Sequence, residues 1–287
     1  MKTSVKCISC FFKQIETASF LAGLDEKKKK YIFSLLTKKL LKFDFNNPPV
    51  VFGRTIYKTV SRISKVKDIF AKEKIKIENF LKRKISFLEK KLEKEKNSLY
   101  LGAKLSCLGN SVDFGAGEYP DLKKIFLEME RVKFKVNHFK LFKKKLKEAK
   151  KILFVADNCG EVFFDRLFIK EILKYHPNLK IFYAARSSPI INDVLVEDAK
   201  RAEMDKLTTV FSSGCGYPGL ILSKTSVYFK KIWKKVDFVI SKGQGNFESL
   251  KSKKDIFYIF KIKCPTVSDF LSLPQDSLLF LYNKYMV

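Results

Sequence analysis

The chain of 287 residues has few of the residues on which several classes of protein depend. It contains two histidines, His138 and His176, and neither lies in a pattern that suits a Ser-His-Asp or Cys-His mechanism. Six cysteines in a chain of this length do not suggest a disulfide framework. The GxxxxGK(S/T) motif of P-loop proteins and the GxGxxG dinucleotide-binding motif are also missing. We therefore expect neither a histidine-based hydrolase nor a protein that binds nucleotides through one of these motifs.

Long hydrophobic runs are missing as well. No stretch approaches the roughly 18 uncharged apolar residues of a transmembrane helix. The N-terminus is basic, but its apolar part from Phe11 to Leu24 is interrupted by Lys13 and Glu16, so it does not resemble a signal peptide. We expect a cytoplasmic protein without a membrane partner.

Negative charge is scarce relative to positive charge. The chain has 58 lysines and arginines against 30 acidic residues, a formal net charge of +28. Such an excess raises nucleic acid as a partner. The excess is mostly lysine spread along residues 27–150, however, and arginine, the preferred reader of bases and phosphates, is uncommon. A nucleic-acid-binding protein therefore stays an alternative and is not the favoured interpretation.

Residues 1–150 are expected to form a helical N-terminal region. Asp25 is a candidate N-cap for a helix that runs through Leu41, and Asn46-Asn47-Pro48-Pro49 breaks the chain. Apolar residues recur at three- and four-residue steps from Ile63 to about Leu92, which predicts one long amphipathic helix. Further helical segments are expected over 11–42, 101–108 and 121–150.

In residues 151–287, short apolar runs alternate with helical patterns. This alternation indicates an α/β core with a mostly parallel sheet. The predicted strands are 152–156, 180–185, 208–211, 236–241, 255–260 and 277–282. Polar or glycine-bearing segments follow the first four strands. Because ligands bind beyond the carboxyl ends of parallel strands, these four loops are expected to converge on one rim.

Two of these loops carry oxygen ligands. Asp157-Asn158 follows the first strand and Asn192-Asp193 follows the second. Carboxylate and amide oxygens are hard ligands that suit Mg²⁺ or Mn²⁺. Each aspartate could instead cap the helix that follows it.

A glycine-rich loop follows the fourth strand, with the sequence Ser241-Lys242-Gly243-Gln244-Gly245-Asn246-Phe247-Glu248. Its glycines allow the backbone to approach a ligand, its N–H groups at the start of a helix can bind an anion, and Lys242 adds a positive charge. Next to a metal site, this loop favours a phosphate. Arg186 could orient a substrate anion or pair with Glu197 or Asp198.

The N-terminal Cys7-x-x-Cys10 is weak evidence by itself. Incidental thiols are the simpler interpretation, and a structural metal or a redox role is the alternative.

Taken together, these motifs resemble the DUF89 family, also called the damage-control phosphatases or the ARMT1-like domain family, and most closely its small archaeal and bacterial branch. The resemblance extends over nearly the whole chain, and one departure lies at Lys67-Asp68-Ile69-Phe70, where the family is expected to have Asp-Pro-Tyr. The residues that carry it are Cys7-x-x-Cys10, Gly109-Asn110-x-x-Asp113-Phe114-Gly115, Asp157-Asn158-Cys159-Gly160-Glu161, Arg186-x-x-Pro189-x-x-Asn192-Asp193, Lys242-Gly243-Gln244-Gly245-Asn246-Phe247-Glu248 and Lys263-Cys264-Pro265.

The resemblance implies a helical N-terminal part on a three-layer αβα core and a phosphatase that depends on a divalent metal. The metal ligands would be Asp157, Asn158 and Asp193, with Lys242 placed to meet the phosphate. The implied substrates are small phosphorylated metabolites, damaged or surplus, such as sugar phosphates or phosphopantetheine derivatives. A carboxyl methyltransferase activity, proposed for a eukaryotic branch, stays a second alternative.

The resulting hypothesis gives catalytic roles to Asp157, Asp193 and Lys242. Mg²⁺, Mn²⁺, Co²⁺ or Ni²⁺ would bind a phosphoryl oxygen and position or activate a water molecule. Whether Asp157 attacks the phosphorus directly is left open, as are the oligomeric state and whether the N-terminal helices form a lid. The expected substrate-binding residues are Asn110, Glu161, Arg186, Asn192, Gly243, Gly245 and Asn246.

Overall fold

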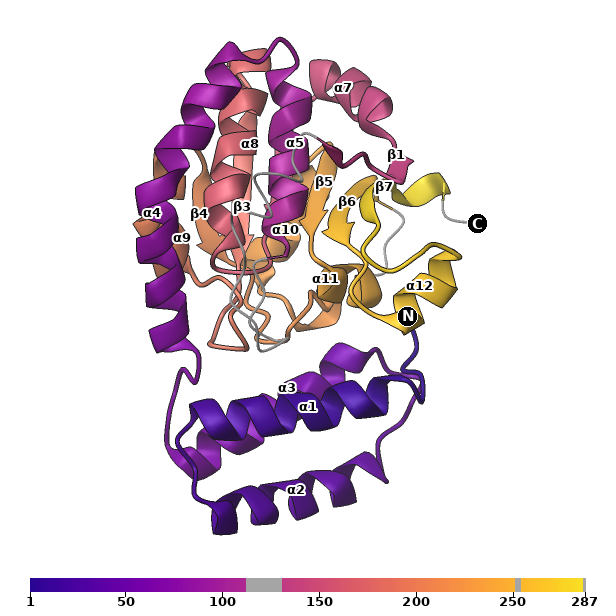
Figure 1. Cartoon of the computed structure of the whole chain (residues 1–287). Coiled ribbons are helices and arrows are strands. Elements are labelled where there is room, and N and C mark those ends of the chain that lie inside the picture. Colours follow the sequence, from indigo (N-terminus) through magenta and orange to yellow (C-terminus); the bar gives the residue numbers. More distant parts are fainter. Residues whose placement is uncertain (112–130, 251–253, 286–287) are drawn as a thin grey trace.

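A computed structural model describes residues 1–111, 131–250 and 254–285 (Figure 1). Its centre is a seven-stranded sheet in the order β1-β7-β6-β5-β2-β3-β4. Neighbouring strands are parallel except β6 and β7, which are antiparallel. The strands are β1 (Val136–Asn137), β2 (Lys151–Val155), β3 (Lys180–Ala185), β4 (Thr209–Ser212), β5 (Phe238–Lys242), β6 (Ile256–Lys261) and β7 (Leu278–Tyr282). All six predicted strands are confirmed, with ends shifted by at most two residues.

The sheet is covered on both faces, which explains the uninterrupted apolar runs of its central strands. In β2, Ile152 and Phe154 belong to one buried cluster and Leu153 and Val155 belong to another. The first face packs against α5 (Ser98–Gly109), α7 (Phe139–Glu148) and α8 (Glu161–Tyr175), with α4 (Ala71–Lys94) outside them. The second face packs against α10 (Val227–Lys235), α11 (Gln244–Ser249) and α12 (Pro265–Leu271). The expected three-layer α/β fold is confirmed.

The first three helices form a separate layer across one end of the sheet (Figure 1). They are α1 (Cys7–Leu21), α2 (Glu26–Leu40) and α3 (Pro49–Ser64). Asp25 is the N-cap of α2, as predicted, and its side chain accepts a hydrogen bond of 2.8 Å from the Lys28 N–H. The remaining short helices are α9 (Val196–Arg201) and the 3₁₀ turns η2 (Met204–Lys206), η3 (Leu222–Lys224) and η4 (Asn283–Tyr285).

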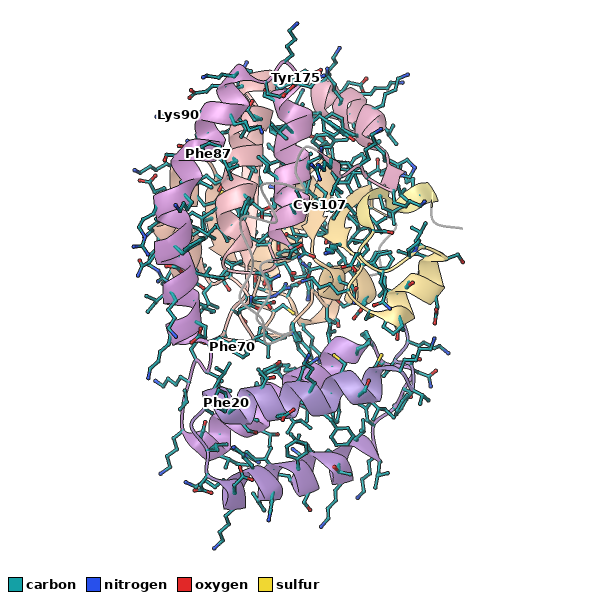
Figure 2. All side chains as sticks on the ribbon, in the orientation of Figure 1. Phe20, Phe70, Phe87, Lys90, Cys107 and Tyr175 are labelled. Atoms are coloured by element: carbon teal, nitrogen blue, oxygen red, sulfur yellow. The ribbon has the colours of Figure 1, made fainter. Side chains whose placement is uncertain are left out.

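The prediction of one long helix from Ile63 is wrong at its start. Helix α3 ends at Ser64 because Lys65 adopts a left-handed conformation, with φ of 61°. The Asp68 side chain then accepts a hydrogen bond from the Phe70 N–H, and α4 begins at Ala71. Phe70 is buried at this junction (Figure 2), where it packs edge-on against Tyr57 of α3.

The prediction of helix across 121–150 is also wrong in part. Residues 121–130 lie outside the described residues, and β1 pairs with β7 at the edge of the sheet. The segment Val132-Lys133-Phe134-Lys135-Val136 alternates apolar and charged residues, a strand pattern that the surrounding lysine-rich helices obscured. Helix α7 begins only at Phe139. Within the described residues, no helix is long and apolar enough to cross a membrane.

Candidate active site at the carboxyl ends of the strands

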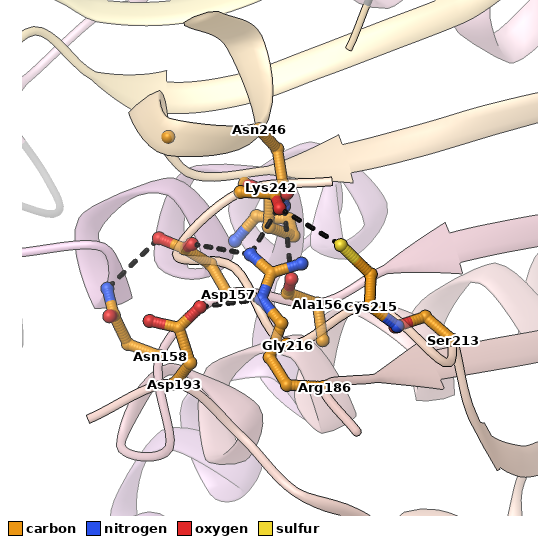
Figure 3. A network of polar contacts seen from close by, with 12 residues as sticks. Ala156, Asp157, Asn158, Arg186, Asp193, Ser213, Cys215, Gly216, Lys242 and Asn246 are labelled. Carbon is orange, nitrogen blue, oxygen red and sulfur yellow. Dashed lines mark hydrogen bonds and ion pairs between the residues drawn. The ribbon is translucent and has the colours of Figure 1, made fainter. Parts of the chain in front are cut away.

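The loops after β2, β3, β4 and β5 meet at one rim, as the sequence predicts (Figure 3). Asp157 and Asn158 directly follow β2, and the loop after β3 brings Asp193 alongside them. The two loops pair through their backbones. The Val194 N–H donates to the Asp157 carbonyl at 2.8 Å, and the Cys159 N–H donates to the Asn192 carbonyl at 2.8 Å. This pairing places Asn158 opposite Asp193.

Arg186 joins the two aspartates (Figure 3). Its Nε lies 2.6 Å from Asp193 Oδ2, and its Nη2 lies 3.5 Å from Asp157 Oδ1. The same Nη2 donates to Asn246 Oδ1 at 3.0 Å. All four side chains are buried. Arg186 therefore pairs with acidic residues, as one of the two predictions for it stated. Its partners are Asp157 and Asp193, however, and the prediction that they would be Glu197 or Asp198 is wrong.

Asn110 and Glu161 form buried hydrogen bonds that hold the loop after β2 in place. Asn110 Nδ2 donates to Asp157 Oδ2 at 3.1 Å and to Glu161 Oε2 at 3.0 Å. Asn110 caps the C-terminus of α5, so the helix that packs on α8 also fixes the Asp157 carboxylate. Both side chains are fully buried.

The glycine loop after β5 approaches the Asp157 carboxylate at Gly243. Gly243 has φ of +79°, and a Cβ at this position would lie 1.9 Å from Asp157 Oδ2. Only glycine fits this backbone and this contact. Asn246, on the helix that follows, donates to the Ala156 and Lys242 carbonyls at 3.1 and 2.6 Å and so ties the glycine loop to β2.

Lys242 points away from this carboxylate pair into a buried cluster. Its Nζ donates to the Ser106 carbonyl at 2.8 Å and forms ion pairs with Glu161 and, at 2.9 Å, with Asp165. Burial opposes the charged form, but the two carboxylates prevail and raise the pKa of Lys242 above its ordinary value. Burial raises the pKa of Asp165 to about 6 even though Lys242 lowers it.

A cavity of about 510 Å³ opens in front of the aspartates. Its floor includes Asp157, Asn158 and Asp193, and its opposite wall comes from α1 and α3. Lys263, two residues beyond the end of β6, also lines this cavity. Its charge acts on Asp157, since it lowers the pKa of that carboxyl. The other lining residues near the aspartates are Ile191, Asn192, Pro218, Gln244 and Gly245.

The electrostatics of Asp157 suit a cation. Burial raises the pKa of the Asp157 carboxyl well above its usual range, and Asp193 and Glu161 raise it further, while Arg186 and Lys263 lower it. Two carboxylates and two amide side chains line this part of the cavity and offer oxygen donors, a set that fits Mg²⁺ or Mn²⁺ better than a thiophilic metal.

The sequence interpretation missed a second group of potential ligands. Glu78, Cys159 and Asp198 are buried, and one ligand atom from each lies within 4.8 Å of the others. Cys159 donates to Glu78 Oε1 at 3.1 Å beneath the Asp157-Asn158 turn. The group already contains cations, because Arg201 lies 2.8 Å from Glu78 and Lys74 lies 3.3 Å from Asp198. Nothing in the sequence alone indicated that α4 would supply Lys74 and Glu78.

The fold and the site together define an α/β protein with a carboxylate-lined cavity at the carboxyl ends of parallel strands. The model of the damage-control phosphatase ARMT1-like domain family matches residues 3–279. The chain belongs to this family, which the resemblance in the sequence had indicated.

Individual relatives agree with this assignment. The chain is similar to a damage-control phosphatase of Pyrococcus horikoshii, with 33% identity over 289 residues and 99% of both chains covered. A damage-control phosphatase of Archaeoglobus fulgidus is 26% identical, with 93% of this chain and 94% of the relative covered. The crystal structure of a DUF89 family protein from P. horikoshii superposes with a TM-score of 0.89 at 33% identity, again over 99% of both chains.

Proposed function

We propose that this protein is a divalent-metal-dependent phosphatase that hydrolyses small phosphomonoesters. The observation that carries the proposal is the pair of buried carboxylates, Asp157 and Asp193, on the floor of a cavity that Lys263 also lines. The names of the P. horikoshii and A. fulgidus relatives support phosphatase activity.

Asp157, Asn158 and Asp193 are the proposed metal ligands. When bound, Mg²⁺ or a similar ion supplies Lewis-acid stabilisation of a phosphoryl oxygen and a polarised water molecule. Arg186 then has a positioning role. It contacts both aspartates, so it holds their carboxylates in place and limits their repulsion. Asn110 fixes the second oxygen of Asp157 in the same manner.

The two lysines near the site have different proposed roles. Lys263 lines the cavity and is placed to meet an anion there. Lys242 is engaged with Glu161 and Asp165, so we assign it a positioning role through the contacts that connect Glu161 to Asn110 and Asp157. The backbone of Gln244 and Gly245 forms the side of the cavity next to Lys263 and is the proposed further anion contact.

The proposed substrate class is small phosphorylated metabolites, such as sugar phosphates or phosphopantetheine derivatives. A cavity of about 510 Å³ accommodates molecules of this size. Its far wall contains Phe11, Val50 and Tyr57 from α1 and α3, so the part of the substrate beyond the phosphate would contact an apolar surface from the N-terminal layer.

The test is phosphate release from p-nitrophenyl phosphate and a panel of small phosphomonoesters. Metal-stripped protein receives Mg²⁺, Mn²⁺, Co²⁺ or Ni²⁺, and Asp193→Asn is compared with Asp205→Asn, which changes an exposed aspartate outside the site. We expect turnover that requires added metal, is abolished in Asp193→Asn and is unchanged in Asp205→Asn. Folded wild-type protein that releases no phosphate with any metal would refute the proposal, as would an Asp193→Asn variant of full activity.

A further inference from the structure

Three of the six free cysteines line the part of the cavity next to Lys263 and Gln244 of the proposed phosphatase site. Cys7 and Cys10 belong to the first turn of α1, and Cys264 directly precedes α12. These three line the cavity together with Glu248 of α11. Residues more than 250 positions apart in the sequence thus line one cavity, between the N-terminal helical layer and the α/β core.

Specific contacts connect this group. Cys7 Sγ lies 3.7 Å from Oγ1 of Thr266, two residues beyond Cys264. Gln244 Nε2 donates to Cys264 Sγ at 3.2 Å and to Glu248 Oε1 at 2.7 Å. The thiol and the carboxylate therefore both lie within hydrogen-bond distance of one nitrogen.

Cys10 completes the group from the side of α1. Its pKa is raised mainly by burial, and Glu248, Cys264 and Cys7 each raise it further, so its thiol lies within electrostatic range of all three. Cys7 and Cys10 are three positions apart in a helix, which places them on the same face.

The chemistry of these donors differs from that of the aspartate pair. Three thiols and one carboxylate are a ligand set for a thiophilic divalent ion with tetrahedral coordination, whereas Mg²⁺ prefers oxygen ligands alone. We propose that Cys7, Cys10 and Cys264, with Glu248 as the fourth ligand, bind a Zn²⁺-class ion in this part of the cavity. Binding would displace the thiol protons into solvent, and it does not depend on the phosphatase reaction.

The proposed ligand atoms must move closer together to bind an ion. Among the described residues, the only three cysteine, histidine or acidic ligand atoms within 4.8 Å of one another belong to Glu78, Cys159 and Asp198, so the cysteine group must draw together around an ion. The side-chain neighbours of Cys10 and Cys264 are the neutral amides of Gln14 and Gln244. Rotation of these side chains breaks no ion pair. A bound ion would link α1 to the loop before α12 and so hold the α1 wall of the cavity in place.

The more compact group is a weaker candidate for the same chemistry. Arg201 and Lys74 already neutralise Glu78 and Asp198, so an added ion would bring excess positive charge into a balanced and buried network.

The experiment uses Co²⁺ as a spectroscopic probe in reduced, full-length protein with excess Mg²⁺ to occupy the aspartate site. Thiolate ligands give Co²⁺ a near-ultraviolet charge-transfer band that oxygen ligands do not produce. We expect this band to saturate at one Co²⁺ per chain and to be displaced by Zn²⁺, which binds such sites more tightly. Cys7→Ser and Cys264→Ser should each weaken or abolish the band. Cys107→Ala, a buried cysteine in α5, should retain it, and so should Asp193→Asn.

Circular dichroism of each variant separates loss of the site from loss of the fold. Glu248→Gln gives an independent check, because it should weaken Co²⁺ binding while the thiolate band persists at higher Co²⁺ concentration. Folded and reduced wild-type protein without the band would overturn the proposal. The same holds for a band that survives both cysteine substitutions, and for the finding that Cys264 is held in a disulfide with Cys7 or Cys10 in the protein as isolated.

Discussion

Replacement of Gly243 by alanine tests how tightly the glycine loop constrains the proposed metal ligand. The new Cβ would lie 1.9 Å from Asp157 Oδ2, whereas side-chain carbons essentially never approach an atom closer than 3.0 Å. The carboxylate or the loop must therefore move by about 1 Å. The backbone adds strain of about 1–3 kcal/mol, because alanine rarely adopts φ of +79° with ψ of 153°.

These two effects predict different losses. A misplacement of about 1 Å at a reacting centre can cost about 10²-fold in rate, so metal-dependent phosphate release should fall by at least that factor. The strain of about 1–3 kcal/mol should by itself lower the melting temperature by about 2–12 °C, since about 1 kcal/mol corresponds to roughly 2–4 °C in a domain of 150–250 residues. Activity should therefore fall far more than stability.

Gly23→Ala is the matched control. Gly23 also has a positive φ, +66°, but a Cβ there would meet nothing within 4 Å. This variant should have a comparable backbone strain with full activity and full metal affinity. Phosphate release and Mn²⁺ affinity measured for both variants decide the question. If Gly243→Ala retains wild-type metal affinity and turnover, the inferred contact between the loop and Asp157 is refuted.

Three further substitutions have defined outcomes. Arg186→Met leaves two buried carboxylates without their cation and should cost about 3–5 kcal/mol of unfolding free energy in metal-free protein. The loss, measured by denaturant titration, should shrink with saturating Mn²⁺, and an equal loss in both conditions would contradict the account. Lys263→Gln should lower kcat/KM by about 10²-fold with little change in stability, whereas the same substitution at Lys13, on the cavity wall in α1, should have a smaller effect. Burial raises the pKa of Glu248 from 4.5 to about 7, so the folded state holds its proton more tightly than the unfolded state. The unfolding free energy of zinc-free protein should therefore fall as pH rises from about 4.5 to 7, and Glu248→Gln should reduce this slope.

Much of the core could be predicted from the sequence because its signals are local. Each strand is a short apolar run that ends in polar residues, and parallel strands necessarily bring those ends to one edge. This reasoning predicts that Asp157, Asn158 and Asp193 lie together, and the structure brings them to one rim. It failed for β1, whose alternating pattern is brief and lies among lysine-rich helical segments. It also failed at Lys65 to Phe70, where a left-handed residue and the Asp68 side chain interrupt an otherwise continuous helical pattern.

The partners of charged side chains were the least predictable part of the site. Lys242 sits in the glycine-rich loop and so suggested a phosphate contact, but its direction depends on Glu161 and Asp165 of α8. Arg186 could have paired with several acidic residues, and its choice depends on how the loop after β3 folds back on β2. Lys263 belongs to the Lys263-Cys264-Pro265 motif that supports the family resemblance, but nothing in the sequence indicated that its side chain would line the cavity beside Asp157. Such contacts join distant segments, and a single sequence does not encode them as a pattern.

The most direct test of the metal assignment is a crystal structure of the protein soaked in Mn²⁺, with the ion located by its anomalous scattering. We predict one strong peak on the cavity floor, within bonding distance of Asp157, Asn158 and Asp193, with Arg186 still in contact with Asp193. A peak at Glu78, Cys159 and Asp198 without one at the aspartate pair would contradict the account, and so would the absence of any peak in protein that is active with Mn²⁺.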